Sequence, residues 1–234
     1  FTVRLATRTG EATLEAARLV LATGYFDHPN LVDVPGESLP HVSHRFEEAH
    51  RTAHQDVVIV GGKNSAIEAA LLAFRAGAGV TLVYRGTTFK PTVKYWLRPD
   101  FDNRVAAGEI AARMGTQVER ITPHAVDIRH AAGSAESLPA ARVYLLTGYH
   151  PDFELLTSLG VTLDLETGRA EVDPATCESN VPSLYLAGSV ASGRRISEVF
   201  IENGRFDGEK IFGDAASRHQ ADARYAASPR PVGE

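Results

Sequence analysis

The sequence predicts an α/β protein organised around a strand, a helix and a second strand at residues 56–86. Residues 57–60 are an unbroken β-branched run, as in a parallel strand buried on both faces. Apolar residues then recur at helical spacing up to Gly77, and residues 80–83 form a second apolar run. A strand, a glycine turn, a helix and a strand in this order predict a Rossmann-like, three-layer nucleotide-binding domain.

The glycine turn after the first strand is the predicted cofactor site. Asn64 or Ser65 is expected to cap the following helix, whose buried face is predicted to carry Ile67, Leu71, Leu72 and Phe74. Unpaired backbone N–H groups at such a helix start face the carboxyl edge of the sheet, where a pyrophosphate binds. The alternative is an ordinary strand, turn and helix without a ligand. The predicted pyrophosphate site comprises Gly61, Gly62, Lys63, Asn64, Ser65 and Ala66.

This turn departs from the usual G-x-G-x-x-G/A pattern at one position. Gly61 and Ala66 match the pattern, whereas Lys63 replaces the second glycine. A glycine there lets the backbone approach the phosphates closely. A lysine can offset that loss because its ammonium group binds the same phosphates.

The end of the second strand indicates which dinucleotide binds. An NAD site has Asp or Glu there, about twenty residues past the first glycine, to bond the ribose hydroxyls. This chain has Tyr84-Arg85 instead, and a planar guanidinium matches a 2′-phosphate. We therefore predict NADPH rather than NADH, with a solvated surface arginine as the alternative.

The composition excludes several classes of protein. With 234 residues, 44% of them hydrophobic and 23% charged, the chain suffices for one large domain or two small ones. A net charge of −5 without a basic stripe argues against nucleic acid as the main partner. No apolar run is long enough to span a bilayer and no signal-peptide pattern opens the chain, so we expect no membrane partner and a cytoplasmic location.

The amino-terminal residues predict a small β-meander. Its strands are expected at residues 2–7, 13–15 and 18–22, the last being the most apolar. The chain opens directly on a strand pattern, so we expect it to be the later part of a longer protein. Residues 27–55 have the proline-rich, charged composition of a linker, and the four histidines at 41–54 lack the cysteine or carboxylate support of a zinc site.

Beyond residue 86 the chain alternates between apolar strands and helices. The basic and aromatic segment at residues 89–97 is predicted either as an exposed patch beside the nucleotide or as a loop with its tryptophan buried. Cys177, the one cysteine, is interpreted as a bystander thiol because no base or resolving partner is near it in sequence. The remaining elements are short strands at 110–130, strands at 141–147 and 183–187, a helix at 153–159, an amphipathic helix at 196–212 interrupted around Asn203-Gly204, and a frayed tail around 229–231.

Two strands close on the same tripeptide, Thr-Gly-Tyr. One ends in Ala22-Thr23-Gly24-Tyr25 and the other in Thr147-Gly148-Tyr149. Turn chemistry explains either one taken singly. The repetition nevertheless suggests two related nucleotide-binding domains, one of them only partly present.

Several motifs together resemble the YpdA-type bacillithiol disulfide reductases, which are flavoproteins of the thioredoxin-reductase-like group. The lysine in the glycine turn is the most specific match, and the resemblance spans essentially the whole chain. The matching stretches are Val60-Gly61-Gly62-Lys63-Asn64-Ser65-Ala66-Ile67-Glu68-Ala69-Ala70, Val83-Tyr84-Arg85-Gly86, Phe46-Glu47-Glu48-Ala49-His50, Gly148-Tyr149-His150-Pro151-Asp152 and Phe200-Ile201-Glu202-Asn203-Gly204-Arg205-Phe206.

The resemblance implies an NADPH-binding domain inserted in a partial FAD-binding domain, as in flavoproteins with two dinucleotide-binding domains. The NADPH-binding domain is expected at 56–147, the partial FAD-binding domain and linker at 1–55, and the rest of the FAD-binding domain at 148–234. The family's first glycine fingerprint and its characteristic cysteine are absent from these residues. Ser189 stands where the broader superfamily has an aspartate that holds the flavin's ribityl chain.

The implied cofactors are FAD and NADPH, and the cofactors carry the reactivity. No catalytic acid, base or metal ligand is therefore assigned. Arg85, which follows Tyr84 in the chain, and Lys94 are expected at the 2′-phosphate. The residues expected near FAD or at the closing turns are Thr23, Gly24, Gly148, Tyr149, Gly188, Ser189, Asn203 and Gly204.

The implied activity is NADPH-dependent reduction of a low-molecular-weight disulfide, bacillithiol disulfide, by a homo-oligomeric enzyme. One alternative is a related reductase whose acceptor is ferredoxin, a quinone or a thioredoxin-like protein. The absence of a Cys-x-x-Cys pair makes the thioredoxin-like acceptor the least favoured of these. The other alternative is a nucleotide-binding fragment without turnover.

Overall fold

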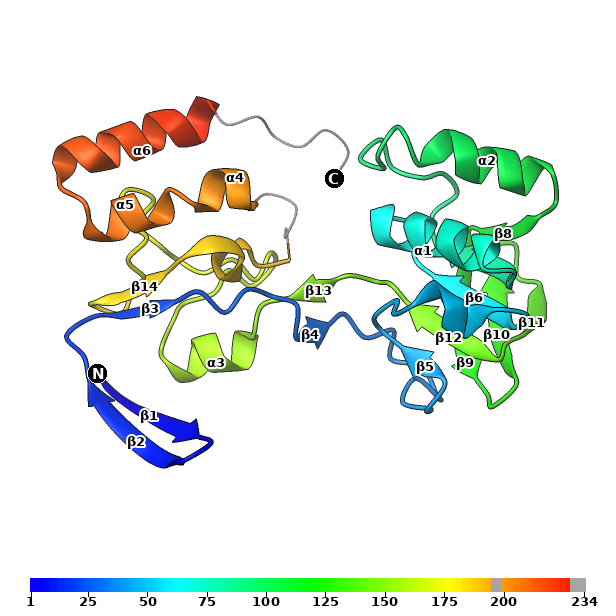
Figure 1. Ribbon diagram of the computed structural model, residues 1–234, viewed down its shortest axis with the longest axis horizontal. Coiled ribbons are helices and arrows are strands. Elements are labelled where there is room, and N and C mark those ends of the chain that lie inside the picture. The colour runs from blue at the N-terminus through cyan, green and yellow to red at the C-terminus, as the bar shows by residue number, and fades with distance from the viewer. Residues whose placement is uncertain (195–198, 228–234) are drawn as a thin grey trace. The chain divides into compact units, whose positions relative to one another are not determined.

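A computed structural model describes residues 1–194 and 199–227, which form two compact units (Figure 1). The inserted unit is Pro29–Gly148. The flanking unit combines Phe1–His28 with the described residues from Tyr149 onward. The short strands β4 (His28–Pro29) and β13 (Tyr149–His150), where the chain passes between units, pair with each other.

The inserted unit contains the predicted parallel sheet, in the strand order β5-β12-β6-β7-β8. The strands are β5 (Val42–Ser43), β6 (Asp56–Val60), β7 (Gly79–Tyr84), β8 (Ile110–Met114) and β12 (Arg142–Leu145). The order reverses on either side of β6, as in Rossmann-type sheets that bind nucleotides at the switch point. The predicted α/β fold class is confirmed. β5 comes from residues 27–55, which the sequence predicts as a linker.

Alternate residues of the buried strands contact different layers. Val57 and Ile59 pack in one hydrophobic cluster with α1 (Asn64–Arg75) and α2 (Arg98–Ala106). Val58 packs in a second cluster with the antiparallel sheet β11-β10-β9. Helices, parallel sheet and antiparallel sheet therefore form three layers. The antiparallel strands are β9 (Thr116–Ile121), β10 (Ala125–His130) and β11 (Ala135–Pro139), and a 3₁₀ turn, η1 (Ala49–Thr52), precedes β6.

The predicted buried face of α1 is correct except at one residue. Ile67 and Leu71 are buried and Phe74 packs against the same cluster, as their spacing of four and three residues predicts. Leu72 is 38% exposed because it lies about 100° around the helix from Leu71. Gly77 ends the helix with a positive φ of 87°, and its N–H donates to the Phe74 carbonyl.

A polar network connects the edge of the parallel sheet to the antiparallel sheet. Arg113 on β8 donates two hydrogen bonds of 2.8 Å to the Glu136 carboxylate on β11. His130 on β10 lies 3.3 Å from the same carboxylate and 3.0 Å from the Thr116 hydroxyl. The Arg113 hydrogen bonds are the main cause that lowers the pKa of Glu136 to about 2.

The Glu136 network is expected to make the stability of the inserted unit depend on pH. Because the folded pKa lies below the usual value of 4.5, the stabilisation is complete above that pH and is lost as pH falls towards 2. The side chains are one-third exposed, so the contribution is about 1 kcal/mol at most. Urea unfolding of Glu136→Gln between pH 2 and 6 measures it. Glu68→Gln, at an exposed carboxyl without an ion pair in the described residues, is the control, and equal pH dependence of both variants would contradict the assignment.

The predicted amino-terminal meander is wrong in its third strand. β1 (Thr2–Thr7) and β2 (Gly10–Glu15) form the expected antiparallel hairpin. β3 (Leu19–Leu21) leaves this hairpin and pairs in parallel with β14 (Leu184–Leu186). The physical reason is burial. The hairpin is largely exposed, whereas β3 and β14 pack in an apolar cluster with Leu156 and Val190.

The carboxyl-terminal helices also differ from the prediction. Residues 196–198 lie outside the described residues, and Phe200 is extended rather than helical. The predicted interruption is present, but it lies at Arg205–Phe206, between two short helices, so that Asn203-Gly204 ends the first of them. The tail at 229–231 is also outside the described residues. The helices of this unit are α3 (Phe153–Ser158), the 3₁₀ turn η2 (Gly188–Ser192), α4 (Ile201–Gly204), α5 (Asp207–Phe212) and the unpredicted α6 (Ala215–Ala227).

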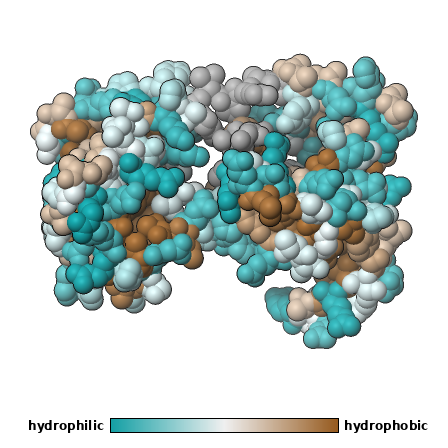
Figure 2. Space-filling model, turned by 180° about the vertical axis from the view of Figure 1, so that it is seen from behind, coloured by the Kyte–Doolittle hydropathy of each residue, from teal (hydrophilic) through white to brown (hydrophobic). Residues whose placement is uncertain are grey.

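The surface is mixed in character. Figure 2 shows one face on which hydrophilic residues surround smaller hydrophobic patches. Within residues 1–194 and 199–227, no helix combines the length and the apolar composition needed to cross a membrane.

Candidate functional site

The glycine turn has a backbone that only glycine can adopt at its first position. Gly61 has a φ of +152°, and its N–H donates to the Val83 carbonyl over 3.0 Å. A Cβ at this position would lie 2.5 Å from the Leu146 carbonyl oxygen and 2.9 Å from the Ala66 Cβ. The turn is therefore packed directly between β7, the residue after β12 and the start of α1.

The start of α1 is not capped by a side chain, contrary to the prediction for Asn64 or Ser65. Lys63 is the N-cap residue, and its carbonyl accepts from the N–H groups of Ala66 and Ile67. Asn64 Oδ1 accepts instead from the backbone N–H of Lys94, at 2.8 Å. This bond pins the segment at residues 87–97 to the helix start.

Backbone donors remain available at this helix end. Among the described residues, the N–H groups of Gly62, Lys63 and Ser65 have no hydrogen-bond partner. They lie at the carboxyl edge of β6, where the partial positive charge of a twelve-residue helix is concentrated. The turn therefore has the donor set of an anion site.

Three cations without acidic partners lie in this turn or in segments that contact it. Lys63 and Arg85 are exposed, Lys94 is half-buried, and the part of the chain that the structure describes offers none of them an ion pair. Most arginines of the inserted unit are paired with carboxylates, among them Arg51, Arg75, Arg98, Arg104, Arg113, Arg120 and Arg129. Unpaired cations near a set of unbonded N–H groups favour a polyanionic ligand.

The segment at residues 89–97 is predicted either as an exposed patch or as a loop with a buried tryptophan. Its tryptophan is exposed. Tyr95 is 75% and Trp96 54% exposed, and the two rings meet edge to face at 5.0 Å. Lys94 Nζ lies 5.5 Å from the Trp96 ring centre. These residues form an exposed aromatic and basic patch.

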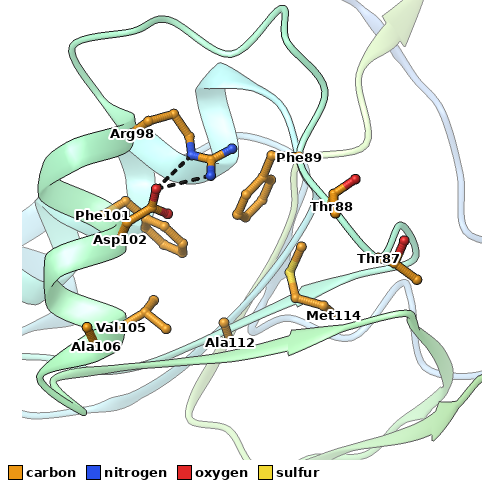
Figure 3. A pocket seen from close by; sticks show the side chains of 10 residues that line it. All are labelled: Thr87, Thr88, Phe89, Arg98, Phe101, Asp102, Val105, Ala106, Ala112 and Met114. Atoms are coloured by element: carbon orange, nitrogen blue, oxygen red, sulfur yellow. Dashed lines mark hydrogen bonds and ion pairs between the residues drawn. The ribbon is translucent and has the colours of Figure 1, made fainter.

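A cavity of about 420 Å³ lies beyond Arg85, between the β7 loop, α2 and β8 (Figure 3). Phe89 and Phe101 form aromatic walls, and Arg98 pairs with Asp102 at one side. The remaining lining side chains are Thr87, Thr88, Val105, Ala106, Ala112 and Met114. The cavity is mostly apolar, with two hydroxyl groups and one ion pair.

In the flanking unit, residues from three predicted positions converge. A Cβ on Gly24 would lie 3.7 Å from Ser189 Oγ, and one on Gly204 would lie 3.5 Å from the Gly188 Cα. Asn203 is buried, and its Oδ1 accepts from the Phe200 N–H at 2.8 Å. Both distances are ordinary van der Waals contacts, so the three segments are neighbours in the fold. Thr23 and Gly24 also line a smaller cavity of about 150 Å³ with Tyr25, Asp27, His28, Asp152 and Leu155.

Asp207 is a residue of this region that the sequence did not reveal. Its carboxylate accepts the Gly188 N–H at 2.7 Å, and burial raises its pKa. Cys177 lies beside it, and burial raises the pKa of this thiol to about 11. A buried, protonated thiol fits the interpretation of Cys177 as a bystander. No local pattern marks Asp207, because its partner is nineteen residues away.

Gly148 and Tyr149 lie where the chain leaves the inserted unit. Gly148 has a φ of +92°, and its carbonyl accepts from the Asn30 N–H at 2.9 Å. The Tyr149 ring packs on Phe26 with a centroid distance of 5.1 Å. Both residues thus have structural contacts, and a cofactor role for them stays a prediction.

The parallel sheet, its glycine turn and the unpaired donors are features of a dinucleotide-binding oxidoreductase domain. Residues 2–188 match the model of the pyridine nucleotide-disulphide oxidoreductase family, and the chain belongs to that family. The predicted resemblance to the YpdA-type proteins is confirmed. The chain is 42% identical to bacilliredoxin reductase Bdr of Bacillus subtilis over 210 residues, which are 90% of this chain and 65% of that protein.

Solved structures agree with this relationship. Bacillithiol disulfide reductase Bdr (YpdA) from Bacillus cereus superposes with a TM-score of 0.87 at 38% identity, over 97% of this chain and 67% of that one. The Staphylococcus aureus protein gives 0.80 at 36% identity, over 94% and 67%. Thioredoxin reductase from T. acidophilum, at 22% identity and a TM-score of 0.65, shares the fold over 96% and 70%. The chain thus spans about two thirds of the length of these relatives.

Proposed function

We propose that the protein, at its full length, is an NADPH-dependent flavin disulfide reductase whose substrate is a low-molecular-weight disulfide, bacillithiol disulfide. The observation that carries this proposal is the glycine turn, which has unbonded N–H groups and an exposed lysine without an acidic partner among the described residues. The names of the Bacillus cereus and Staphylococcus aureus structures support the choice of bacillithiol disulfide.

The residues present fit an NADPH pyrophosphate and 2′-phosphate. The N–H groups of Gly62, Lys63 and Ser65 would hold the pyrophosphate, with the Lys63 ammonium in place of the missing glycine contact. Arg85, assisted by Lys94, would bind the 2′-phosphate. Bound there, NADPH supplies a hydride for a flavin.

The flanking unit fits part of a flavin site. Gly24 and Gly188 have positive φ values of 71° and 69°, and Gly204 lies against Gly188, so glycine backbone without side chains is available to a large cofactor. Ser189 lies next to this glycine backbone, and Asp207 holds the Gly188 N–H from the protein side. We assign FAD to this surface and no catalytic acid or base to the chain, because the cofactors supply the reactivity.

The proposed activity predicts two linked measurements on the full-length protein. NADPH should bleach the flavin absorbance under anaerobic conditions, and bacillithiol disulfide should then sustain NADPH consumption. NADH at the same concentration is the matched control and should react at least about tenfold more slowly, since one lost charged hydrogen bond is worth that much. A flavin that stays oxidised with NADPH would overturn the proposal.

A second acceptor deserves a direct comparison, because the Bacillus subtilis relative is named bacilliredoxin reductase. Purified bacilliredoxin disulfide, ferredoxin and a quinone should be offered to the same enzyme beside bacillithiol disulfide. Bacillithiol disulfide is expected to give the highest kcat/KM. A higher kcat/KM with one of the other acceptors would show that this acceptor is the substrate, and the assignment as an NADPH-dependent reductase would stand.

A further inference from the structure

Tyr84 occupies the position that usually recognises the adenosine ribose. It is the last residue of β7, 23 positions after Gly61, and the N–H of Gly61 is bonded to the preceding residue, Val83. In NAD-binding sheets an acidic side chain at this point bonds the ribose hydroxyls. A neutral aromatic ring takes its place here.

The Tyr84 ring contacts glycine backbone on two sides. A Cβ on Gly62 would lie 2.2 Å from ring atom Cε2, and a Cβ on Gly86 would lie 2.6 Å from ring atom Cε1. Both distances are shorter than side-chain carbons allow, so the ring fits only because both neighbours are glycines. The chain at residues 84–86 therefore folds around the ring, and the ring lies against the glycine turn.

The ring is held in this place by further contacts. Phe89 stacks on it at a centroid distance of 5.5 Å with an interplanar angle of 6°. The Arg98 guanidinium lies 4.9 Å from the Phe89 ring centre and is bonded to Asp102, as Figure 3 shows. The stack Tyr84–Phe89–Arg98 thus extends from the glycine turn to α2.

Arg85 lies between Tyr84 and Gly86, the glycine that packs on the Tyr84 ring. Its side chain is exposed and has no ion-pair partner in residues 1–194 and 199–227, so no salt bridge fixes its position. The backbone on either side of it is set by Tyr84 and by Gly86, which packs on the Tyr84 ring.

We propose that Tyr84 is a positioning residue for the 2′-phosphate site: its ring, wedged between Gly62 and Gly86, holds the Arg85 turn in register with the N-terminus of α1. The ring thereby couples the place for the pyrophosphate to the place for the 2′-phosphate. This inference rests on the proposed function, because it assumes that NADPH binds at the glycine turn. It adds Tyr84, which does not touch the phosphate, to Arg85 and Lys94 as a residue that determines the discrimination between NADPH and NADH.

Binding of two half-molecules to the full-length enzyme tests this directly. Adenosine 2′,5′-bisphosphate and adenosine 5′-diphosphate are titrated by calorimetry, and the ratio of their Kd values measures recognition of the 2′-phosphate. Tyr84→Ala should reduce the ratio at least about fivefold, whereas Tyr84→Phe, which keeps the ring, should leave it within about twofold of wild type. Tyr225→Ala, at a 38% exposed tyrosine on α6 outside the inserted unit, is the control and should also leave the ratio unchanged.

A double-mutant cycle separates positioning from general loss of structure. In an Arg85→Ala background the Tyr84→Ala change should have no further effect on the ratio, because the positioned group is gone. If Tyr84→Ala instead weakens both probes equally, or acts equally in both backgrounds, the ring is only structural and the inference is overturned. Wild-type protein that binds neither probe would overturn the proposed function itself. Should Tyr84→Ala fail to fold, Tyr84→Leu provides the same comparison.

Discussion

Replacing Arg85 by alanine is expected to weaken NADPH binding by about 1.5–3 kcal/mol, roughly ten- to a hundredfold, and to leave NADH binding nearly unchanged. Arg85 is exposed and is offered no acidic partner by the described residues, so its guanidinium is available to a 2′-phosphate. Loss of a charged hydrogen bond to a phosphate accounts for the magnitude. The measurement is the Kd of each cofactor by fluorescence titration of the full-length protein.

The control for this experiment is an arginine on α1, the helix that follows the glycine turn. Arg75 lies at the last turn of α1, is exposed and is already paired with Asp100 at 2.6 Å. Arg75→Ala should leave the binding of both cofactors unchanged. Equal losses of NADPH and NADH affinity in Arg85→Ala would refute the 2′-phosphate role.

Gly61→Ala is expected to be the most disruptive single substitution at the glycine turn, lowering the free energy of unfolding by about 2–5 kcal/mol. Its φ of +152° disfavours any side chain, and its Cβ would lie 2.5 Å from the Leu146 carbonyl oxygen. Two penalties therefore add, backbone strain and a steric clash with Leu146, the residue that follows β12. Urea unfolding measures the change.

Gly133 provides a control that has the strain without the clash. It lies in the turn between β10 and β11 with a φ of +92°, and a Cβ there would meet nothing within 4 Å. Gly133→Ala should cost about 1–2 kcal/mol, the strain component only. If Gly61→Ala and Gly133→Ala were equally destabilised, the contact between residue 61 and the Leu146 carbonyl would add nothing to the cost of a side chain in the glycine turn.

Much of the candidate site follows from local pattern. The β-branched run, the glycine turn and the helical spacing of Ile67 and Leu71 depend on residues close together in the chain, and all appear as predicted. The position of Tyr84-Arg85 at the end of β7 follows in the same way from counting along the chain. The predicted ligand roles of these residues await the binding measurements above.

Predictions from local pattern were wrong where a residue far away in the chain bonds or pairs with the group in question. Asn64 is a good capping residue by type, but its side chain accepts the Lys94 N–H, thirty residues away. The Leu19–Leu21 strand reads as a third strand of a hairpin, but it pairs with Leu184–Leu186 because that partner buries it.

Strand runs, helix spacing and glycine turns could be read from this chain without coordinates, because each depends on backbone preferences and periodicity within a few residues. Folding then settled which strand β3 joined, that Trp96 is exposed, that Asp207 binds the Gly188 N–H and that Tyr84 fills the space beside two glycines. These outcomes depend on packing and hydrogen bonds between segments far apart in sequence, where burial free energy selects among partners that local pattern leaves equivalent.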